Sequence, residues 1–423
     1  MSEQNAVAIA TATHPIDGHV RVPASKSLAN RELLLSALAD GTSRVDLGSL
    51  DPGDDVRRML AMLRGLGFDV GTDDGSVEIE GTDGEIPAET GRVDAGDAGT
   101  VARFGAAFLS LGTGPYVLDG SRRMRERPMA PLAAALRALG ARVDGDALPL
   151  AIEGPATGGE IALHVDVSSQ FASALLIVAP LLEEGLVLRL IGTPVSAPFV
   201  DLTLSAMRRR GIEAKRSASE LAVVPGGYVS RDVAIEGDAT NAAYFFAAAA
   251  IVGGAVTVEN VPRASEQGDV RLLDHLAAMG CGTRSDGAGT RVEALAPLRA
   301  LGDVDLADVS DTFPTLAVCC AFAEGESVLR GVAHTRQQES DRVRAVATEL
   351  ARLGADVEEL PDGIRVRGGR ALHGAAIATY GDHRIAMAFA LAGLRVPGVR
   401  ITAPGCVAKT FPAYFETLSS LTA

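Results

Sequence analysis

The sequence predicts an α/β protein made of two similar domains. A pattern recurs in which an amphipathic helix ends in an apolar residue and glycine, followed by a strand, a turn and a second strand. The glycines that mark it are separated by 73, 71, 69 and 74 residues, namely Gly67, Gly140, Gly211, Gly280 and Gly354. A period near 71 fits six times into 423 residues. Each glycine falls where a helix needs a left-handed terminator before extended chain.

The two ends of the chain are expected to meet in one domain. The last helix, expected over residues 413–421, has no strand after it, so the sixth unit lacks its second half. Apolar alternation in the first 22 residues can supply the missing strands. Six units then divide as three and three. We expect one domain over residues 23–235 and a discontinuous one over residues 1–22 plus 236–423.

Composition limits the kinds of partner. The chain has 47% hydrophobic residues, a net charge of −15 and no tryptophan. A nucleic-acid surface needs basic patches and stacking aromatic side chains, so we expect none. No apolar stretch is long enough for a membrane span, and the amino terminus lacks the pattern of a secretory signal. We expect a cytoplasmic protein without a membrane segment.

No resident metal or cofactor is expected. The four cysteines show no metal-ligand spacing, the histidines are scattered, and no phosphate-binding GxxxxGK[ST] string occurs. The basic residues are more informative. Only three of the 39 are lysines, and two of them, Lys26 and Lys409, stand in short segments of small residues. Because lysine offers a compact ammonium in place of a forked guanidinium, these two are candidate functional residues.

Polar residues collect where apolar helical runs begin. These starts are Ser25–Ser27, Ala98–Thr100, Ser168–Gln170, Asp238–Asn241, Asp311–Thr312, Glu339–Arg342 and Asp382–Arg384. Free backbone N–H groups and about half a positive charge make a helix start attractive to phosphate or carboxylate. Serine, threonine and aspartate are also ordinary capping residues, so one start alone predicts little. Arginines one turn later, such as Arg31, Arg103 and Arg342, favour anion binding.

One arginine-rich segment, residues 122–128, is expected to be a flexible loop before a helix that begins near Pro128. Residues 408–412 resemble it near the end of the chain.

Read together, these segments resemble the 5-enolpyruvylshikimate-3-phosphate synthase family over nearly the whole chain. The matching strings are SKSLANR at 25–31, DAGTVARF at 97–104, RMRERP at 123–128, SSQF at 168–171, EGDAT at 236–240, SDTFP at 310–314, ESDR at 339–342, DHRIAM at 382–387 and AKTFP at 408–412. The resemblance implies two domains of three βαβαββ units each, an inside-out α/β barrel, closing around substrates in the cleft between them.

The resemblance also implies a reaction in aromatic amino acid biosynthesis. The enolpyruvyl group of phosphoenolpyruvate would pass to the 5-hydroxyl of shikimate 3-phosphate through a tetrahedral ketal, with release of phosphate. It further implies a monomer without cofactors, and glyphosate competing with phosphoenolpyruvate. Proton transfers at the vinyl carbon and the hydroxyl call for general acid and base groups.

Residue roles follow from the matched motifs. Shikimate 3-phosphate would be held by Ser27, Arg31, Ser168, Ser169 and Ser196, with Gln170 near both substrates. Phosphoenolpyruvate would be surrounded by Lys26, Gly99, Arg127, Arg342, Arg384 and Lys409. Asp311 would accept the hydroxyl proton, and Glu339 would act at the methylene carbon, with Lys26 as a possible helper. Without the resemblance, Asp311 and Glu339 would be interpreted as ordinary helix-start residues.

This sequence departs from the family pattern at several positions. His334 and Gln338, also matched to substrate-binding positions, stand where asparagine and lysine are common. Phe199 replaces a frequent tyrosine, and Asp97 and Gly381 replace a frequent asparagine.

Two other functions stay open. A UDP-N-acetylglucosamine enolpyruvyl transferase shares the fold and chemistry, but that family typically has a cysteine in the loop matching residues 113–127, and none occurs here. A non-catalytic anion-binding protein would keep the cations and use the carboxylates only as caps.

Overall fold

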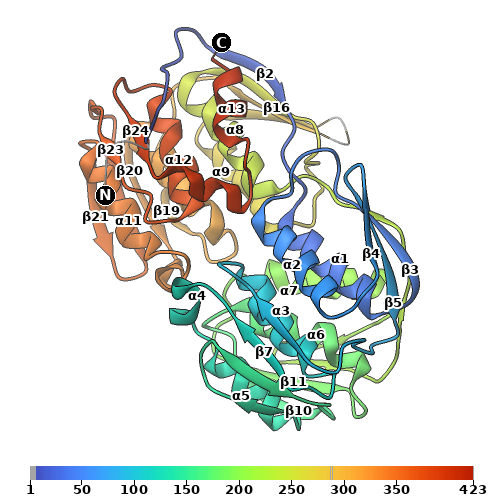
Figure 1. The fold of residues 1–423 in the computed structure, drawn as a ribbon. Coiled ribbons are helices and arrows are strands. Elements are labelled where there is room, and N and C mark those ends of the chain that lie inside the picture. The colour runs from blue at the N-terminus through green and yellow to red at the C-terminus, as the bar shows by residue number, and fades with distance from the viewer. Residues whose placement is uncertain (1–5, 286, 288, 423) are drawn as a thin grey trace. The chain divides into compact units, whose positions relative to one another are not determined.

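The computed structural model describes residues 6–285, 287 and 289–422 (Figure 1). By its internal contacts the chain forms two compact units. We call residues 24–235 the middle unit, and residues 1–23 with 236–423 the terminal unit.

The middle unit contains three sheets of one design. In each sheet a parallel strand pair continues into two antiparallel pairs, with orders β14-β3-β5-β4, β6-β7-β9-β8 and β10-β11-β13-β12. A further strand, β15 (Val233–Ala234), also pairs with β3. The strands are β3 (Ala39–Asp46), β4 (Val70–Asp73), β5 (Ser76–Thr82), β6 (Gly91–Asp94), β7 (Tyr116–Asp119), β8 (Arg142–Asp144), β9 (Leu150–Glu153), β10 (Gly159–His164), β11 (Leu186–Ile191), β12 (Lys215–Arg216), β13 (Glu220–Val223) and β14 (Tyr228–Val229).

The terminal unit repeats that design. Its sheets have the orders β2-β16-β18-β17, β19-β20-β22-β21 and β1-β24-β23, again with one parallel pair followed by antiparallel pairing. The strands are β1 (Ala6–Ala8), β2 (Ile16–Val20), β16 (Gly254–Val258), β17 (Cys281–Ser285), β18 (Thr290–Ala294), β19 (Gly302–Asp305), β20 (Gly325–Arg330), β21 (Asp356–Leu360), β22 (Gly363–Gly368), β23 (Ala376–Ile377) and β24 (Arg400–Thr402).

The first residues of the chain complete two sheets of the terminal unit. Strand β1 pairs antiparallel with β24, and β2 pairs in parallel with β16. The chain then leaves this unit beside its point of return, where the Pro23 carbonyl accepts from the Asp238 N–H at 2.9 Å. The two ends of the sequence therefore belong to one body.

Each unit is organised around three buried helices. They are α1 (Lys26–Leu38), α3 (Gly99–Leu109) and α6 (Ser169–Val178) in the middle unit, and α8 (Ala239–Val252), α10 (Phe313–Phe322) and α12 (His383–Gly393) in the terminal unit. Nearly every residue of these six helices is buried. Helices buried on all sides belong in a core, and α1 is the one that also buries several charged and polar side chains along its length. Their amino-terminal ends carry the polar residues discussed below.

Amphipathic helices lie outside these cores. They are α2 (Asp54–Gly65), α5 (Ala130–Ala138) and α7 (Pro198–Arg209) in the middle unit, and α9 (Leu272–Ala278), α11 (Arg342–Arg352) and α13 (Tyr414–Ser420) in the terminal unit. Five of them, α2, α5, α7, α9 and α11, are each followed two residues later by a marking glycine. All five of those glycines have left-handed φ angles between 87° and 108°. The predicted helix terminators are thereby confirmed.

The arginine-rich segment differs from its prediction. Instead of a flexible loop, residues Arg122–Glu126 form the short helix α4, capped by Ser121, whose hydroxyl accepts from the Met124 N–H at 3.1 Å. Arg123 and Glu126 pair across one turn at 3.1 Å. The next helix, α5, starts at Ala130 and has Pro131, not Pro128, in its first turn. Within the described residues, no helix is both long and apolar enough to cross a membrane.

Candidate functional site

The start of α1 holds a buried lysine. Ser25 is the N-cap, and the Lys26 ammonium lies 3.1 Å from a carboxylate oxygen of Asp55 on α2. The two side chains are only 13% and 4% exposed. The ion pair with Asp55 fixes the position of the ammonium at the helix start.

Arg31 joins three helices of the middle unit. Its guanidinium donates to the Ser27 carbonyl, the Thr203 hydroxyl and the Phe199 carbonyl at 2.8 Å each. It also donates to Ser173 at 3.3 Å and lies 5.1 Å from the centre of the Phe104 ring. Burial lowers the pKa of Arg31 to about 9. Arg31 thus holds the starts of α1, α6 and α7 together.

Two guanidinium groups converge on the first residue of α3. A Cβ added to Gly99 would lie 3.0 Å from an Arg103 nitrogen and 3.0 Å from an Arg127 nitrogen. Arg103 is itself held by the Pro128 carbonyl at 2.8 Å, and both arginines are buried. Backbone N–H groups and two cations at one helix start are an arrangement that could hold an anion.

Serines stand at the starts of α6 and α7. Ser168 caps α6, accepting from the Gln170 N–H at 3.2 Å, and Ser169 is buried. Ser196, two residues before α7, is buried and has a left-handed φ of 52°. A non-glycine residue in that region is uncommon and marks a strained position.

In the terminal unit, carboxylates surround one buried arginine. Arg342, at the start of α11, donates to Asp382 at 2.8 Å, to Asp311 at 2.9 Å and to Glu339 at 2.8 Å. It also bonds the Gln338 amide oxygen. Arg342 is 1% exposed. Burial alone lowers the pKa of Arg342, but these three carboxylates outweigh it and raise that pKa above its usual value.

The same cluster includes two more cations. Arg384, in the first turn of α12, donates to the second oxygen of Asp311 at 2.6 Å. Lys409 lies 3.9 Å from Glu339. Each of the two carboxylates therefore has two cationic neighbours.

Asp269 is a buried carboxyl that the sequence interpretation missed. It lies in a 3-10 turn (Gly268–Arg271), is 7% exposed, and accepts a hydrogen bond from Thr240 on α8. Burial, helped by the negative charge of Asp311, raises the pKa of Asp269 to about 7. Nothing in the local sequence distinguishes it from an ordinary surface acid.

Several residues that depart from the expected sequence pattern have contacts or backbone angles that account for them. His334 bonds the Ser310 hydroxyl at 3.0 Å, and burial lowers the pKa of His334, so the ring is neutral near pH 7. The Ser121 hydroxyl donates to Asp97. Gly381 has a left-handed φ of 71°, a region that asparagine tolerates better than most other side chains. Its exchange with asparagine is therefore conservative for the backbone.

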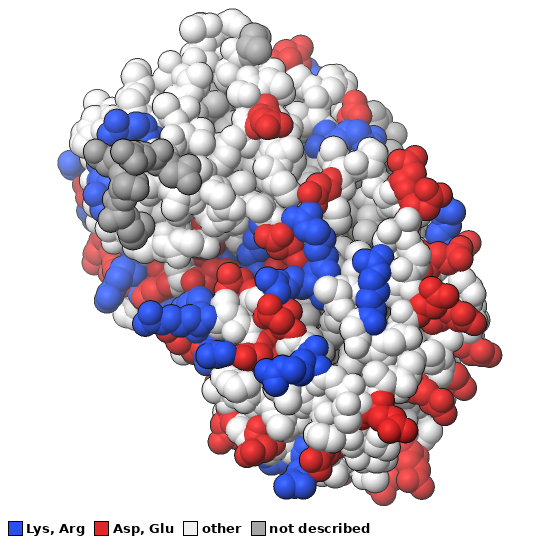
Figure 2. Space-filling view, in the orientation of Figure 1, with Lys and Arg blue, Asp and Glu red and all other residues white. Residues whose placement is uncertain are grey.

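The structure brings the predicted site residues together as two sets, one in each unit. The middle-unit set comprises Lys26, Ser27, Arg31, Gly99, Arg127, Ser168, Ser169, Gln170 and Ser196, all at or beside the starts of α1, α3, α6 and α7. The terminal-unit set comprises Asp311, His334, Gln338, Glu339, Arg342, Arg384 and Lys409, linked by the contacts above. Sequence reasoning missed Asp55, Asp269 and Thr203, which act as partners of these residues. Figure 2 shows basic and acidic side chains next to one another in parts of the face, with large uncharged areas elsewhere.

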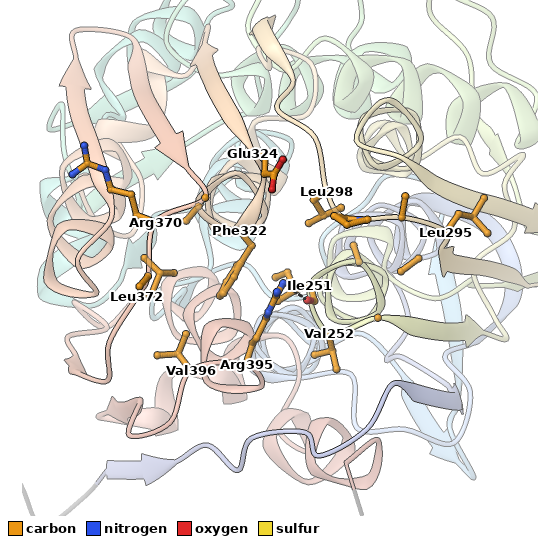
Figure 3. A pocket seen from close by; sticks show the side chains of 18 residues that line it. Ile251, Val252, Leu295, Leu298, Phe322, Glu324, Arg370, Leu372, Arg395 and Val396 are labelled. Atoms are coloured by element: carbon orange, nitrogen blue, oxygen red, sulfur yellow. Dashed lines mark hydrogen bonds between the residues drawn. The ribbon is translucent and has the colours of Figure 1, made fainter.

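A cavity of about 640 Å³ lies at the other ends of the terminal unit's core helices (Figure 3). Its walls include Val252, Leu298, Phe322 and Leu372. Arg395 stands in it with its guanidinium 5.6 Å from the Phe322 ring centre, donating to the Ile251 carbonyl at 3.2 Å. Helix carboxyl ends carry partial negative charge, and Arg395 supplies the matching cation. The predicted site residues belong to the opposite, amino-terminal helix ends.

The fold and the two sets of residues define a class: an α/β protein of repeated units with buried cations at its helix starts and carboxylates beside them. In the described part of the chain, no group of three or more potential ligand side chains is arranged to hold a metal ion.

Comparisons with known proteins identify the family. The family model described as EPSP synthase (3-phosphoshikimate 1-carboxyvinyltransferase) matches residues 10–418. The chain therefore belongs to the EPSP synthase family. It is 43% identical over 418 residues to the 3-phosphoshikimate 1-carboxyvinyltransferase of Thiobacillus denitrificans, covering 96% of each chain. The Nostoc punctiforme protein of the same name is 39% identical over 418 residues, covering 97% of each chain.

A solved structure of EPSP synthase from Acinetobacter baumannii resembles this one. The TM-score is 0.81 at 26% sequence identity, covering 99% of this chain and 98% of that chain. The predicted family and fold class are both confirmed.

Proposed function

We propose that the protein transfers the enolpyruvyl group of phosphoenolpyruvate to the 5-hydroxyl of shikimate 3-phosphate, producing 5-enolpyruvylshikimate 3-phosphate and inorganic phosphate. The names of its relatives support this assignment. The observation that carries it is the terminal-unit cluster, in which Asp311 and Glu339 share Arg342 and each has a second cation beside it. Such a cluster offers anion binding and proton transfer in one place.

Each half of the reaction needs a proton transfer. In the addition, the hydroxyl oxygen bonds to the central carbon of phosphoenolpyruvate, its proton passes to Asp311, and the methylene carbon gains a proton to become methyl. In the elimination, the bond to the phosphate oxygen breaks, phosphate leaves, and the methyl group returns a proton. We assign the transfers at this carbon to Glu339, with Lys26 as a candidate helper.

The two sets divide the binding work. We assign phosphoenolpyruvate to Arg342, Arg384 and Lys409 of the terminal unit and to Lys26, Gly99 and Arg127 of the middle unit. Both ends of that molecule are anionic, and fixed guanidinium groups suit phosphate and carboxylate. We assign shikimate 3-phosphate to Ser27, Arg31, Ser168, Ser169, Gln170 and Ser196, with Asp311, His334 and Gln338 contributing from the terminal unit.

The proposal also covers the domain organisation, the oligomeric state and the cellular location of the protein. We propose two three-repeat domains and a monomer, since one chain supplies every residue that the reaction uses. We place the protein in the cytoplasm, because phosphorylated anions do not cross membranes unaided. Light scattering tests the monomer, and a doubled mass would contradict it.

The function is tested by phosphate release from purified protein. With both substrates present, we expect release that requires shikimate 3-phosphate and stops when it is omitted. Equal release when a UDP-N-acetyl sugar replaces shikimate 3-phosphate would instead indicate the related sugar-nucleotide transferase. Tight binding of both substrates without release would indicate an anion-binding protein.

A further inference from the structure

Glu349 is a buried carboxylate outside the proposed reaction. It lies on α11, is 0% exposed, and both of its oxygens accept hydrogen bonds. Oε1 accepts from the Tyr380 hydroxyl at 2.7 Å. Oε2 accepts from the Ala378 N–H at 3.2 Å and from Arg352 at 2.9 Å. Two of the three donors belong to the segment between β23 and α12.

That segment has a demanding backbone. Tyr380 and Gly381 have consecutive left-handed φ angles of 55° and 71°. Glycine adopts this region at little cost, but a bulky residue such as tyrosine does so only when its surroundings hold it there. Tyr380 is 47% exposed, so a surrounding core does not hold it. Its hydroxyl bond to Glu349 does. Partial burial, together with the bond to the Glu349 charge, raises the pKa of Tyr380 to about 12, which keeps the hydroxyl a donor.

The turn leads directly into the cluster of charges. Asp382 follows it, with its N–H donating to the Thr379 carbonyl at 2.8 Å, and caps α12 by accepting from the Arg384 N–H at 2.9 Å. Asp382 also accepts from Arg342 at 2.8 Å, and Arg384 donates to Asp311 at 2.6 Å. Any change in the turn at Tyr380 therefore moves Asp382 and Arg384 together.

One helix holds both ends of this arrangement. Arg342 and Glu349 are seven residues apart on α11, which places them on the same face about 10 Å apart along the helix axis. Arg342 contacts the residue after the turn, and Glu349 contacts the turn itself. Two separate contacts fix the orientation of a segment, whereas a single contact would leave it free to pivot. Helices α11 and α12 lie in the orange-to-red part of Figure 1.

We propose that Glu349 is a positioning residue for phosphoenolpyruvate: by holding Ala378 and Tyr380 it sets where Asp382 and Arg384 stand relative to Arg342. This inference rests on the proposed function, in which Arg342 and Arg384 bind that substrate. Glu349 itself touches neither substrate. It acts through the turn.

The first test is Glu349→Gln, which keeps the side-chain volume. An amide cannot accept at both ends, so its NH2 group must face either Ala378 N–H or the Tyr380 hydroxyl. Loss of one or two hydrogen bonds to a charged group predicts an increase of about tenfold in the KM for phosphoenolpyruvate. The KM for shikimate 3-phosphate should change less than about twofold, because most of its proposed contacts belong to the middle unit and, of the rest, only Asp311 is bonded by Arg384.

The second test is Tyr380→Phe, which removes one hydroxyl from a half-exposed side chain and does not threaten folding. We expect the KM for phosphoenolpyruvate to rise about threefold. Since both substitutions break the same bond, the double variant should be no worse than Glu349→Gln alone. Glu326→Gln is the matched control, because Glu326 also pairs with an arginine, Arg367 at 2.8 Å, but lies far along the chain on β20. It should leave both KM values unchanged.

Three results would overturn the proposal: an unchanged KM for phosphoenolpyruvate in Tyr380→Phe, equal changes in the KM of both substrates in Glu349→Gln, or additive effects in the double variant. If Glu349→Gln does not fold, the KM for phosphoenolpyruvate in Tyr380→Phe alone decides whether the proposal holds. Absence of turnover by the unsubstituted protein would instead refute the proposed function, so the two failures are distinguishable.

Discussion

Arg342 and Asp382 form a buried ion pair, with the guanidinium Nε 2.8 Å from the carboxylate and side chains only 1% and 0% exposed. The pair joins the start of α11 to the start of α12. It is more than a structural bridge, because the remaining Arg342 nitrogens reach Asp311 and Glu339. The two carboxylates assigned to proton transfer are thus placed by an arginine whose own position depends on Asp382.

Replacing Arg342 with lysine should disable this arrangement. A single ammonium cannot reach three carboxylates in different directions as a fork does. We expect kcat/KM to fall at least about a hundredfold and the free energy of unfolding to fall by about 3 kcal/mol, as for a broken buried ion pair. Steady-state kinetics and denaturant unfolding measure the two effects.

Arg344→Lys is the control in the same helix. Arg344 is 73% exposed and lies 4.0 Å from Glu359, so its replacement should change neither quantity noticeably. Equal losses of kcat/KM and of unfolding free energy in Arg342→Lys and Arg344→Lys would contradict this prediction. They would show that any arginine of the helix has the same effect, whether or not it belongs to the buried cluster.

Gly99→Ala should weaken phosphoenolpyruvate binding. The new Cβ would lie 3.0 Å from nitrogens of both Arg103 and Arg127, so at least one guanidinium must shift. We expect the KM for phosphoenolpyruvate to rise about tenfold, since the anion and the methyl group compete for one space. Gly65→Ala is the matched control, because a Cβ there meets nothing within 4 Å. An unchanged KM in Gly99→Ala would exclude Gly99 from the binding site.

Gly354→Ala tests the interpretation of the repeats. Gly354 has a φ of 87°, and a Cβ there would lie 3.0 Å from His373. Alanine in this left-handed position should cost about 1 to 2 kcal/mol of unfolding free energy, while Gly65→Ala inside α2 should cost nothing or stabilise slightly. Urea unfolding of the two variants checks this difference. Equal stabilities would mean that the marking glycines are not needed as terminators.

Asp269→Asn should change the pH dependence of stability. Its pKa of about 7 in the fold exceeds the ordinary value of 3.8, so between these pH values the folded protein keeps a proton that the unfolded chain releases. The contribution of Asp269 to stability is therefore greatest below pH 4 and is lost as pH rises to 7. Asp311, Asp238, Arg384 and Thr240 are the groups that face it.

Asparagine cannot ionise and can still accept from Thr240. We expect the free energy of unfolding of the variant to rise relative to that of the original protein as pH rises from 4 to 8. The relative increase should be roughly 4 kcal/mol at most. Denaturant unfolding at a series of pH values measures the gain. A stability difference that stays constant with pH would contradict a proton on Asp269.

Much of this fold could be predicted because the local sequence preferences agree with the structure that the whole chain adopts. The marking glycines needed only the rule that a left-handed residue ends a helix, and the buried helices followed from long apolar runs such as residues 242–252. The segment 122–128 was mispredicted because charge density suggested a loop. In the structure Ser121 caps it and Glu126 pairs with its arginines, two local contacts that favour a helix.

The site was less predictable than the fold. Motifs identified Arg342 and Arg384, but not that Asp382 connects them, since a capping aspartate looks the same whether or not it binds an arginine 40 residues away. Asp269 and Glu349 gave no signal, because burial of a carboxylate depends on tertiary packing. Phe199 lacks the hydroxyl of the frequent tyrosine, yet its backbone carbonyl holds Arg31 at 2.8 Å, a role independent of the side chain.

The most direct test of enolpyruvyl transfer is NMR of the complete reaction, with phosphorus spectra for the phosphates and proton spectra for the vinyl group. Equimolar phosphoenolpyruvate and shikimate 3-phosphate with purified protein should give inorganic phosphate in step with loss of the phosphoenolpyruvate signal. The 3-phosphate should remain esterified, and new vinyl protons should appear on an ether at the 5-position. Phosphate released from the 3-position, or no new vinyl ether, would contradict the account.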